Sequence, residues 1–348
     1  MKHEELLLSI KEMVTSNPGQ RLPSERSLAL SLGVSRAKVR HVLDRLESDR
    51  LIVRQRGSGN YAVDPHKEQL STVAILVDRD LKLGNDPFYT MLLEQLQSAL
   101  QHEGVRSLIE RIDQDTVLRH QEDALITLGY AGKAVIESLG AEGPPVLGFF
   151  VDANPYPGAQ VSLVQTDNFD AGYQAGKYLC SLGVKELCFV GPENLPASKE
   201  RYLGAKYYCN QHGKRINRLF CRMNYSGGFE AAQQLGSVEE GALHGVIASN
   251  DWVAIGCHTS MISLGQEQRS RHVLVSFDGL PITRDPSLEI HSMAMPVSTI
   301  VRDSIFELQR YIDHPTGSGR VLKYRFEWSK DMIRRLALKQ SQAGGGYM

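Results

Sequence analysis

The apolar pattern of this 348-residue sequence changes at residues 64–69. Before them, apolar residues recur at helical spacing. After them, short continuous apolar stretches alternate with helical ones, which is typical of parallel strands covered by helices on both faces. The segment itself, DPHKEQ, is polar, holds a proline and lacks periodicity, so we interpret it as part of a linker over residues 64–71. The pattern predicts an α/β protein with a small helical head, residues 1–63, and a larger body, residues 72–340.

The body is long enough for two lobes, since domains commonly run to roughly 100–200 residues. We expect each lobe to be built on a doubly wound parallel sheet. Strands are predicted at residues 72–77, 107–111, 124–128, 145–151, 187–190, 245–248 and 273–277. Helices are predicted at residues 88–101, 171–181, 198–211, 229–235 and 253–264.

The formal net charge of −1 is the sum of two opposite parts. Residues 1–63 hold 11 Lys and Arg against 7 Asp and Glu, a net of +4. The rest of the chain holds 28 against 33, a net of −5. This asymmetry indicates an anion-binding head on an acidic body. A solvated basic face is the alternative that charge alone leaves open.

The head carries signals for three helices and a hairpin. Apolar residues at helical spacing from Leu6 to Val14 predict the first helix. The second begins near Ser24 and stops at Gly33, and Ser35 stands at the N-cap of the third. The short turn around Gly33 is the connection of a helix-turn-helix. Two short strands are predicted on either side of the basic, glycine-rich segment RGSG.

The third helix divides into two faces at about 100° per residue. Its buried stripe comprises Val39, Val42, Leu43 and Leu46. Arg36 and Arg40 lie one turn apart beside that stripe, and the small Ala37 continues the exposed arc. A DNA major groove accepts such a helix, because arginine forks pair with guanine edges or phosphates.

Residues 21–63, RLPSERSLALSLGVSRAKVRHVLDRLESDRLIVRQRGSGNYAV, resemble the winged helix-turn-helix of the GntR family. In both, LPSER opens the second helix, GVSR opens the recognition helix, and a glycine-rich wing follows. The resemblance implies binding to double-stranded operator DNA. The implied DNA-binding residues are Arg26, Arg36, Ala37, Lys38, Arg40, Arg56 and Gly57. Alternatively, some of these arginines pair only with Glu25, Asp44 or Glu47.

Polar and aromatic residues follow several predicted strands of the body. Ligands of doubly wound sheets bind outside the carboxyl ends of the strands, so these residues are candidates for a binding site. They stand at residues 78–80, 85–89, 166–168, 198–204 and 249–252.

Four stretches, DNFDAGYQAG, FVGPENLPASKERYLGA, VIASNDWVAIG and VLVSFDG, resemble the effector domain of the LacI/GalR family, which is related to periplasmic sugar-binding proteins. The resemblance implies two lobes joined by three chain crossings, near residues 161–165, 290–294 and 318–322. The first lobe would hold residues 72–163 and 292–320, and the second residues 164–291 and 321–340. A GntR-like head on such a body resembles the architecture of arabinose repressors.

The same resemblance implies a small polar effector, a sugar or sugar derivative, between the lobes. Arg201 and Asp251 match the family's ligand contacts, a guanidinium fork and a carboxylate that suit a ligand rich in hydroxyls. Phe88 or Tyr89 would stack on an apolar ring face. The full set of implied effector residues is Arg201, Asp251, Asp78, Phe88, Tyr89, Asp167 and Tyr225. Two alternatives stay open: Asp251 only caps its helix, and Arg201 only lies on the surface.

Together these features predict a ligand-responsive, homodimeric transcription regulator, most simply a repressor of carbohydrate-metabolism genes. The effector would shift the dimer between states in which the two heads do and do not fit operator half-sites about one helical turn apart. Induction and corepression both remain open. An enzyme and a protein-binding module that use the same two-lobed body are the alternative functions.

Other signals are missing. The sequence lacks GxxxxGK[ST], HExxH, GxSxG and a Cys/His set with metal spacing, so we expect no enzyme, no cofactor and no metal. Five scattered cysteines, no signal peptide and no apolar run of about 18 residues favour a cytoplasmic protein without membrane contact. Residues 341–348 are expected to form a disordered tail.

Overall fold

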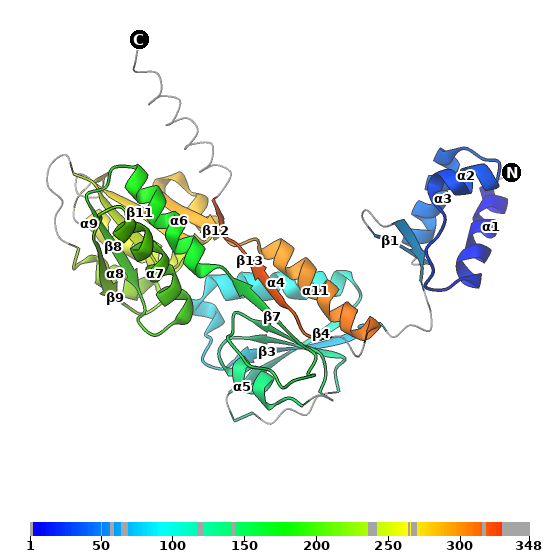
Figure 1. The fold of residues 1–348 in the computed structure, drawn as a ribbon, viewed down its shortest axis with the longest axis horizontal. Coiled ribbons are helices and arrows are strands. Elements are labelled where there is room, and N and C mark those ends of the chain that lie inside the picture. Colours follow the sequence, from blue (N-terminus) through cyan, green and yellow to red (C-terminus); the bar gives the residue numbers. More distant parts are fainter. Residues whose placement is uncertain are drawn as a thin grey trace, which may run out of the picture. The chain divides into compact units, whose positions relative to one another are not determined.

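A computed structural model describes residues 3–49, 51–55, 59–63, 69–113, 115–116, 121–140, 143–235, 242–263, 265, 270–314 and 318–328. The chain forms two compact units, Met1–Gln69 and Leu70–Met348, which are the head and the body (Figure 1). Most of the predicted linker and the whole predicted tail, residues 341–348, lie outside the described residues.

The head combines three helices with a two-stranded hairpin. Its elements are α1 (His3–Ser16), α2 (Glu25–Ser31), α3 (Arg36–Ser48), β1 (Ile52–Gln55) and β2 (Gly59–Ala62). Ser24 and Ser35 cap α2 and α3 as predicted, since each side chain accepts a hydrogen bond from a first-turn N–H. Gly33, in the turn between the two helices, has a φ of 62°, a left-handed conformation that favours glycine. The antiparallel β1–β2 pair forms the predicted wing.

The first lobe of the body is built on a six-stranded parallel sheet in the order β13-β7-β6-β5-β3-β4. Its strands are β3 (Thr72–Asp78), β4 (Arg106–Ile112), β5 (Ala124–Leu128), β6 (Val146–Phe149), β7 (Val161–Thr166) and β13 (Val321–Tyr324). Its helices are η1 (Leu83–Asn85), α4 (Pro87–His102), α5 (Ala131–Ser138) and α11 (Val297–Asp313). The side chains of β5 are all buried, as expected for a strand that helices cover on both faces.

The second lobe has a sheet of the same size in the order β14-β12-β11-β10-β8-β9. Its strands are β8 (Glu186–Gly191), β9 (Ile216–Phe220), β10 (His244–Ala248), β11 (His272–Asp278), β12 (Ile290–Ala294) and β14 (Glu327–Trp328), of which β14 is antiparallel to β12. Its helices are α6 (Asn168–Ser181), α7 (Pro196–Gln211), α8 (Tyr225–Ala232), α9 (Asp251–Ser263), η2 (Pro281–Arg284) and η3 (Pro286–Leu288). Among the described residues, no helix is long and apolar enough to cross a membrane.

Every strand and helix predicted for the body overlaps an element of the same type. The pattern did not predict β7, β9, β12, β13, β14, α5 or α11. For β9 and β13 the reason is physical. Both are edge strands with few fully buried side chains, so neither carries the continuous apolar run of a central strand.

The chain crosses between the lobes a few residues later than predicted. Residues 161–166 still pair in the first sheet as β7, so the first crossing precedes α6. Residues 290–294 pair in the second sheet as β12, so the second crossing precedes α11. β13 pairs with β7 in the first sheet, so the third crossing precedes β14. The predicted lobe boundaries are displaced accordingly, because each crossing follows the end of a paired strand.

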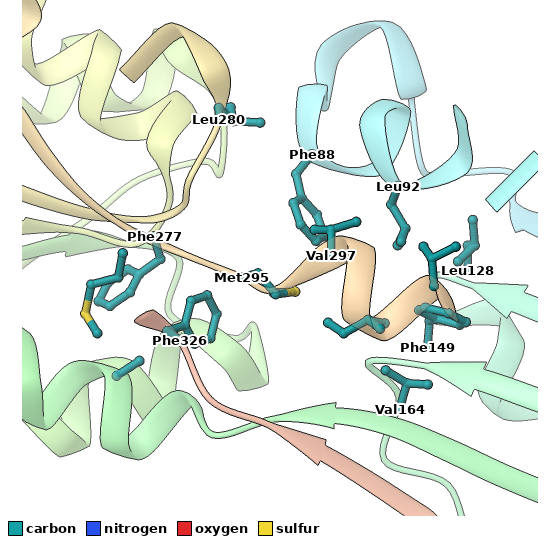
Figure 2. Packing of buried hydrophobic residues seen from close by; sticks show 14 of the residues in the cluster. Phe88, Leu92, Leu128, Phe149, Val164, Phe277, Leu280, Met295, Val297 and Phe326 are labelled. Atoms are coloured by element: carbon teal, nitrogen blue, oxygen red, sulfur yellow. The ribbon is translucent and has the colours of Figure 1, made fainter. Parts of the chain in front are cut away.

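One apolar cluster extends through both lobes (Figure 2). It includes Phe88 of the first lobe and Phe277 of the second. Met295 and Val297 at the second crossing, and Phe326 at the third, belong to the same cluster. Figure 2 shows Val297 beside Phe88 and Met295 between the two lobes. The crossings are therefore packed by burial of apolar side chains as well as joined by the backbone.

Candidate functional site

The α3 helix exposes the residues that the sequence assigned to DNA contact. Its predicted apolar stripe, Val39, Val42, Leu43 and Leu46, is fully buried. Outside that stripe, the exposed residues of α3 include Arg36, Ala37, Lys38 and Arg40, and Arg26 on α2 is exposed as well. The N-terminal half of α3 therefore presents a basic surface whose shape suits a major groove. Arg56 and Gly57 lie outside the described residues.

Glu25, at the start of α2, pairs with two of the three arginines of α3, Arg36 and Arg40. Its Oε2 accepts a hydrogen bond from Nη2 of Arg40 at 2.9 Å, and Nη2 of Arg36 lies 4.0 Å from the same atom. The Arg40 hydrogen bond lowers the pKa of Glu25. The Arg40 side chain still keeps 59% of its surface exposed. The alternative pairing is therefore present, yet it leaves the guanidinium accessible, and exposed pairs of this kind are weak.

The other two acidic residues named as alternative partners bind a different arginine. Arg54 on β1 donates a hydrogen bond from Nη2 to Asp44, and its Nε lies 3.0 Å from Oε2 of Glu47. These contacts fix the wing strand to α3 and leave the α3 arginines unpaired with Asp44 and Glu47 in the described part of the head.

Arg201 on α7 is buried, with 3% of its surface exposed, so it is not the surface arginine of the alternative interpretation. Its Nε donates to Asn168 Oδ1 at 2.9 Å and its Nη1 donates to the Ser249 carbonyl. The guanidinium carbon lies 4.7 Å from the ring centroid of Phe277 and 4.9 Å from that of Phe326. Hydrogen bonds and two aromatic rings thus hold the guanidinium in one place.

Two glycines set the position of Arg201. α6 and α7 approach so closely that a Cβ on Gly172 would lie 1.8 Å from the Arg201 carbonyl oxygen. A Cβ on Gly204 would lie 1.9 Å from the Phe169 carbonyl oxygen. Because only glycine fits at these two contacts, the helices pack backbone to backbone and bring Arg201 within reach of Asn168.

Asp251, predicted to contact the effector, is fully buried and its carboxylate is occupied by the protein. Oδ1 accepts hydrogen bonds from the hydroxyls of Ser276 and Ser292, and Oδ2 accepts one from the Leu280 N–H at 2.7 Å. Burial raises its pKa to about 6, and these hydrogen bonds oppose the rise. The cap of α9 is Asn250, whose Oδ1 accepts from the Val253 N–H. These hydrogen bonds tie Asp251 to the ends of β11 and β12.

Asp278 is the carboxylate that the sequence analysis missed. It ends β11, keeps 5% of its surface exposed, and has a φ of 111°. Such a backbone is strained for any residue but glycine, and strain of this kind gathers at binding sites. Phe150, which directly follows β6 in the first lobe, has a φ of 56°. A signal was available, because Asp278 follows a predicted strand just as Asp78 does.

Aromatic rings stand at the strand ends of the first lobe. Phe88 is buried, and its ring centroid lies 5.5 Å from that of Tyr89 and 5.9 Å from that of Phe150. Tyr89 and Phe150 have their centroids 6.3 Å apart. The predicted pair Phe88 and Tyr89 is thus brought together with a third ring that the sequence analysis did not single out.

The remaining predicted residues make local contacts. Asp78 Oδ2 accepts from the Ala131 N–H at the start of α5. Asp167 caps α6 and lies 3.3 Å from Nζ of Lys323. Tyr225 packs with Phe229 and Trp252. Tyr225 and Trp252 pack against the apolar cluster of α8 and α9, whereas the rings around Arg201 belong to the cluster that joins the lobes.

Charged groups of the two lobes act on one another at the strand ends. Burial raises the pKa of Tyr89, and the charges of Asp86 and Asp278 add to that rise. Burial raises the pKa of Asp278 well above its ordinary range, and Asp251 reinforces this while Arg201 opposes it. Burial lowers the pKa of Arg201. Groups of the first lobe, Asp86 and Tyr89, therefore lie within electrostatic reach of Arg201 and Asp278 of the second.

Two family models match this chain. The model described as bacterial regulatory proteins, gntR family, matches residues 3–61. The model described as periplasmic binding proteins and sugar binding domain of the LacI family matches residues 71–302. The second match covers most of the chain, and the boundary between the two falls at the division between head and body.

Individual proteins resemble the chain more distantly. The HTH-type transcriptional regulator AscG of Escherichia coli K12 is 26% identical over 155 residues, which are 43% of this chain and 46% of AscG. The arabinose metabolism transcriptional repressor of Geobacillus stearothermophilus is 22% identical over 183 residues, which are 49% of this chain and 50% of the repressor. The chain thus matches about half the length of these curated relatives.

A solved structure extends the likeness over the body. The LacI family transcriptional regulator of Enterococcus faecium, crystallised with bound ribose, superposes with a TM-score of 0.64 at 22% identity. The match covers 75% of this chain and 97% of that one, and at this identity it concerns the fold. With a gntR-family domain at its N-terminus, the chain belongs to the family of periplasmic binding proteins and sugar binding domains of the LacI family.

Proposed function

We propose that this protein is a transcription regulator, a repressor in its simplest form, whose affinity for operator DNA is controlled by a small sugar-like effector bound between the lobes of the body. The observation that carries the proposal is the combination in one chain of an exposed arginine surface on α3 and a buried, immobilised Arg201 at the strand ends of a two-lobed body. The curated relatives AscG and the arabinose repressor support it, since both are named as transcription regulators.

The head would bind DNA through α3 in the major groove. Arg36 and Arg40 would supply forks for guanine edges or phosphates, with Lys38 and Arg26 adding phosphate contacts. Glu25 would hold Arg40 in a defined rotamer before binding. The proposed operator is pseudo-palindromic, because a homodimer would present two such heads.

The effector would bind at the strand ends where Arg201, Asp278, Phe88 and Tyr89 lie. A guanidinium donates to ligand oxygens, a carboxylate accepts from hydroxyls, and aromatic rings cover the apolar face of a sugar ring. Asp251 would act through its neighbours, by fixing the strand ends that carry Asp278 and Ser292. This assignment moves the predicted ligand carboxylate from Asp251 to Asp278.

Effector binding and operator binding would be coupled by a shift in population between two arrangements of the lobes. Ligand contacts made by both lobes favour one arrangement of the lobes, and the arrangement sets whether two heads fit two half-sites. A coupling free energy of about 1–3 kcal/mol is typical of such systems, and it must be reciprocal between DNA and effector.

The decisive experiment selects operator sequences from random duplex DNA with the full-length chain and measures their affinity by fluorescence anisotropy. We expect a specific site whose log affinity falls linearly with log salt, because phosphate contacts release counterions. Addition of a stabilising sugar should change that affinity. If no sequence is enriched, or if the affinity for DNA does not depend on salt, the proposal that this protein regulates transcription is refuted.

A further inference from the structure

Two of the cysteines, which are scattered in the sequence, lie against each other in the structure. Cys180 stands at the C-terminal end of α6 and is half-buried, and Cys209 stands at the C-terminal end of α7 and is fully buried. A side-chain hydrogen bond joins the two thiols. A disulfide needs its two Cα atoms within about 7 Å, so the spacing of the two helices decides whether this pair can form one.

The spacing of α6 and α7 is set by a register that the two helices keep along their length. Gly176 of α6 packs on Ala205 of α7, one turn after the contact made by Gly172. A Cβ on Gly176 would lie 3.3 Å from the Cα of Ala205, so the two backbones are in contact there. One turn further along each helix stand Cys180 and Cys209. The helices are therefore parallel, and the two cysteines follow directly on the close approach that glycine permits.

A lysine lies within electrostatic reach of both thiols. Lys214 is half-buried just beyond the end of α7, and its Nζ donates a hydrogen bond to the Val184 carbonyl at 3.1 Å. Burial raises the pKa of both thiols, to about 12 for Cys209, and the charge of Lys214 opposes the rise. The raised pKa values make attack on an oxidant slow at neutral pH. They also stabilise the disulfide once it is formed, because its reduction must release a thiolate that is a poor leaving group.

From this geometry we infer that Cys180 and Cys209 are a redox modification site, a dithiol that hydrogen peroxide oxidises to a disulfide between α6 and α7. The sulfur of Cys180, the more exposed thiol, attacks one peroxide oxygen, the O–O bond breaks, and the products are a sulfenic acid and one water. The sulfur of Cys209 then attacks the sulfur of Cys180, the S–O bond breaks, and a second water leaves. One peroxide thus accepts the two electrons of one dithiol.

The disulfide would fasten the pair of helices that places Arg201. It would join the C-terminal ends of α6 and α7, whose N-terminal halves bring Asn168 and Arg201 together. In a compartment that keeps thiols reduced, such a bond forms only while an oxidant is present. A dithiol reductant restores both thiols, so the modification is reversible. This assignment goes beyond the proposed function and does not depend on what the body binds.

The test oxidises the reduced full-length protein with a slight excess of hydrogen peroxide at pH 8 until the loss of thiols stops. We expect two thiols per chain to be lost, and the tryptic peptides of residues 178–185 and 207–214 to be joined until dithiothreitol is added. The oxidised protein should melt roughly 5–10 °C higher, because the bond constrains the unfolded chain. No loss of thiols, a sulfinic acid at Cys180 without a cross-link, or a cross-link between other cysteines overturns the inference.

Two variants separate disulfide formation from simple oxidation of an exposed thiol. In Cys209→Ser, oxidation of Cys180 should stop at the sulfenic acid, which dimedone traps, and no cross-link should form. Cys257→Ser removes a buried thiol that bonds to the Gly228 carbonyl, and it should form the cross-link as the parent does. Melting temperatures establish that both reduced variants fold. A cross-link in Cys209→Ser, or none in folded Cys257→Ser, would contradict the assigned pair.

A further pair of variants tests the role of Lys214. Lys214→Met should slow the loss of thiols about threefold or more at pH 8, because the Cys180 thiolate loses a nearby positive charge. Lys206→Met is the matched control on α7, since Nζ of Lys206 lies over the ring of Tyr202, and it should react at the parent rate. Equal rates in the two variants would show that Lys214 does not promote the reaction.

Discussion

Asn168 accepts a hydrogen bond from the Nε–H of Arg201 at 2.9 Å, and this bond links a chain crossing to the candidate effector site. Asn168 is the first residue of α6, which directly follows β7 of the first lobe. Both residues belong to the second lobe, so the bond fixes the guanidinium to the residue at which the chain enters that lobe from the first.

Replacement of Asn168 tests that connection. Asn168→Ala leaves the buried Nε–H of Arg201 without its acceptor, which should lower the free energy of unfolding of the body by about 1–3 kcal/mol. Effector affinity should fall as well, because the guanidinium is no longer fixed. Differential scanning calorimetry and titration with a bound sugar measure the two effects. Gln174→Ala, later on the same helix, is the control and should change neither; equal losses in both variants would contradict the role given to Asn168.

Replacement of Gly172 tests how much the close packing of α6 and α7 contributes to stability and to the position of Arg201. In Gly172→Ala the new Cβ would lie 1.8 Å from the Arg201 carbonyl oxygen, so the helices must separate. We expect a loss of about 1–3 kcal/mol in stability from the forced displacement, together with weaker effector binding. Gly140→Ala provides the comparison, because its Cβ meets open space. Similar melting temperatures for the two variants would show that α6 and α7 tolerate the methyl group.

The pH dependence of stability should report on Asp251. Burial raises its folded-state pKa to about 6, against about 3.9 in an unfolded chain. Between these values the folded state binds the proton more tightly, so the Asp251 contribution to stability falls as pH rises from about 4 to about 6. Asp251→Asn removes that contribution. Measured by urea unfolding, the stability of the variant relative to the parent should therefore increase with pH, by up to about 3 kcal/mol.

Asp285 should make a contribution to stability whose dependence on pH is opposite to that of Asp251. Hydrogen bonds from Ser287 lower the pKa of this exposed carboxylate. Its contribution is present at neutral pH and is lost as the pH falls through its lowered pKa. The stability of Asp285→Asn relative to the parent should therefore decrease with rising pH. The same trend in the Asp251 and Asp285 variants would argue against the buried carboxylate as the origin of the pH effect.

Replacement of Arg40 tests whether the exposed arginine surface of α3 binds DNA. Arg40→Ala should weaken binding to a selected operator by roughly 10–150-fold, the range of a lost bidentate base contact of about 1–3 kcal/mol. Effector binding should stay unchanged, since the substitution lies in the head. Arg45→Ala, on the same helix beside Asp49, is the matched control and should cost far less. If the two variants bind the operator equally well, the wrong face of α3 has been assigned.

Local chemistry made the head predictable. Ser24 and Ser35 act within the first turns of their own helices, and the α3 stripe depends only on the helical period. The pairing of Arg40 with Glu25 is different, because it depends on how α2 and α3 cross. Sequence reasoning could name Glu25 as a partner, but only the packed helices decide which arginine reaches it.

The different contacts of Asp251 and Asp278 in the body could not be predicted from the sequence. Both follow predicted strands and both are aspartates, so the pattern alone does not separate them. The hydroxyls that occupy Asp251 come from Ser276 on β11 and Ser292 on β12, which are neighbours only through the parallel register of the sheet. The left-handed backbone of Asp278 likewise follows from the loop it enters. Tertiary register, which short-range pattern does not encode, decides which carboxylate the serine hydroxyls bind.

The position of β13 has a consequence for biosynthesis. This strand is translated after the whole of the second lobe except β14, yet it pairs with β7 at the edge of the first sheet. A nascent chain can therefore complete neither sheet while the ribosome still holds its last strands. Assembly of the first lobe must wait on contacts of long sequence separation, which are slow to form. The two lobes are expected to mature nearly together, late in synthesis, while the head, whose contacts are local, is free to fold as soon as it emerges.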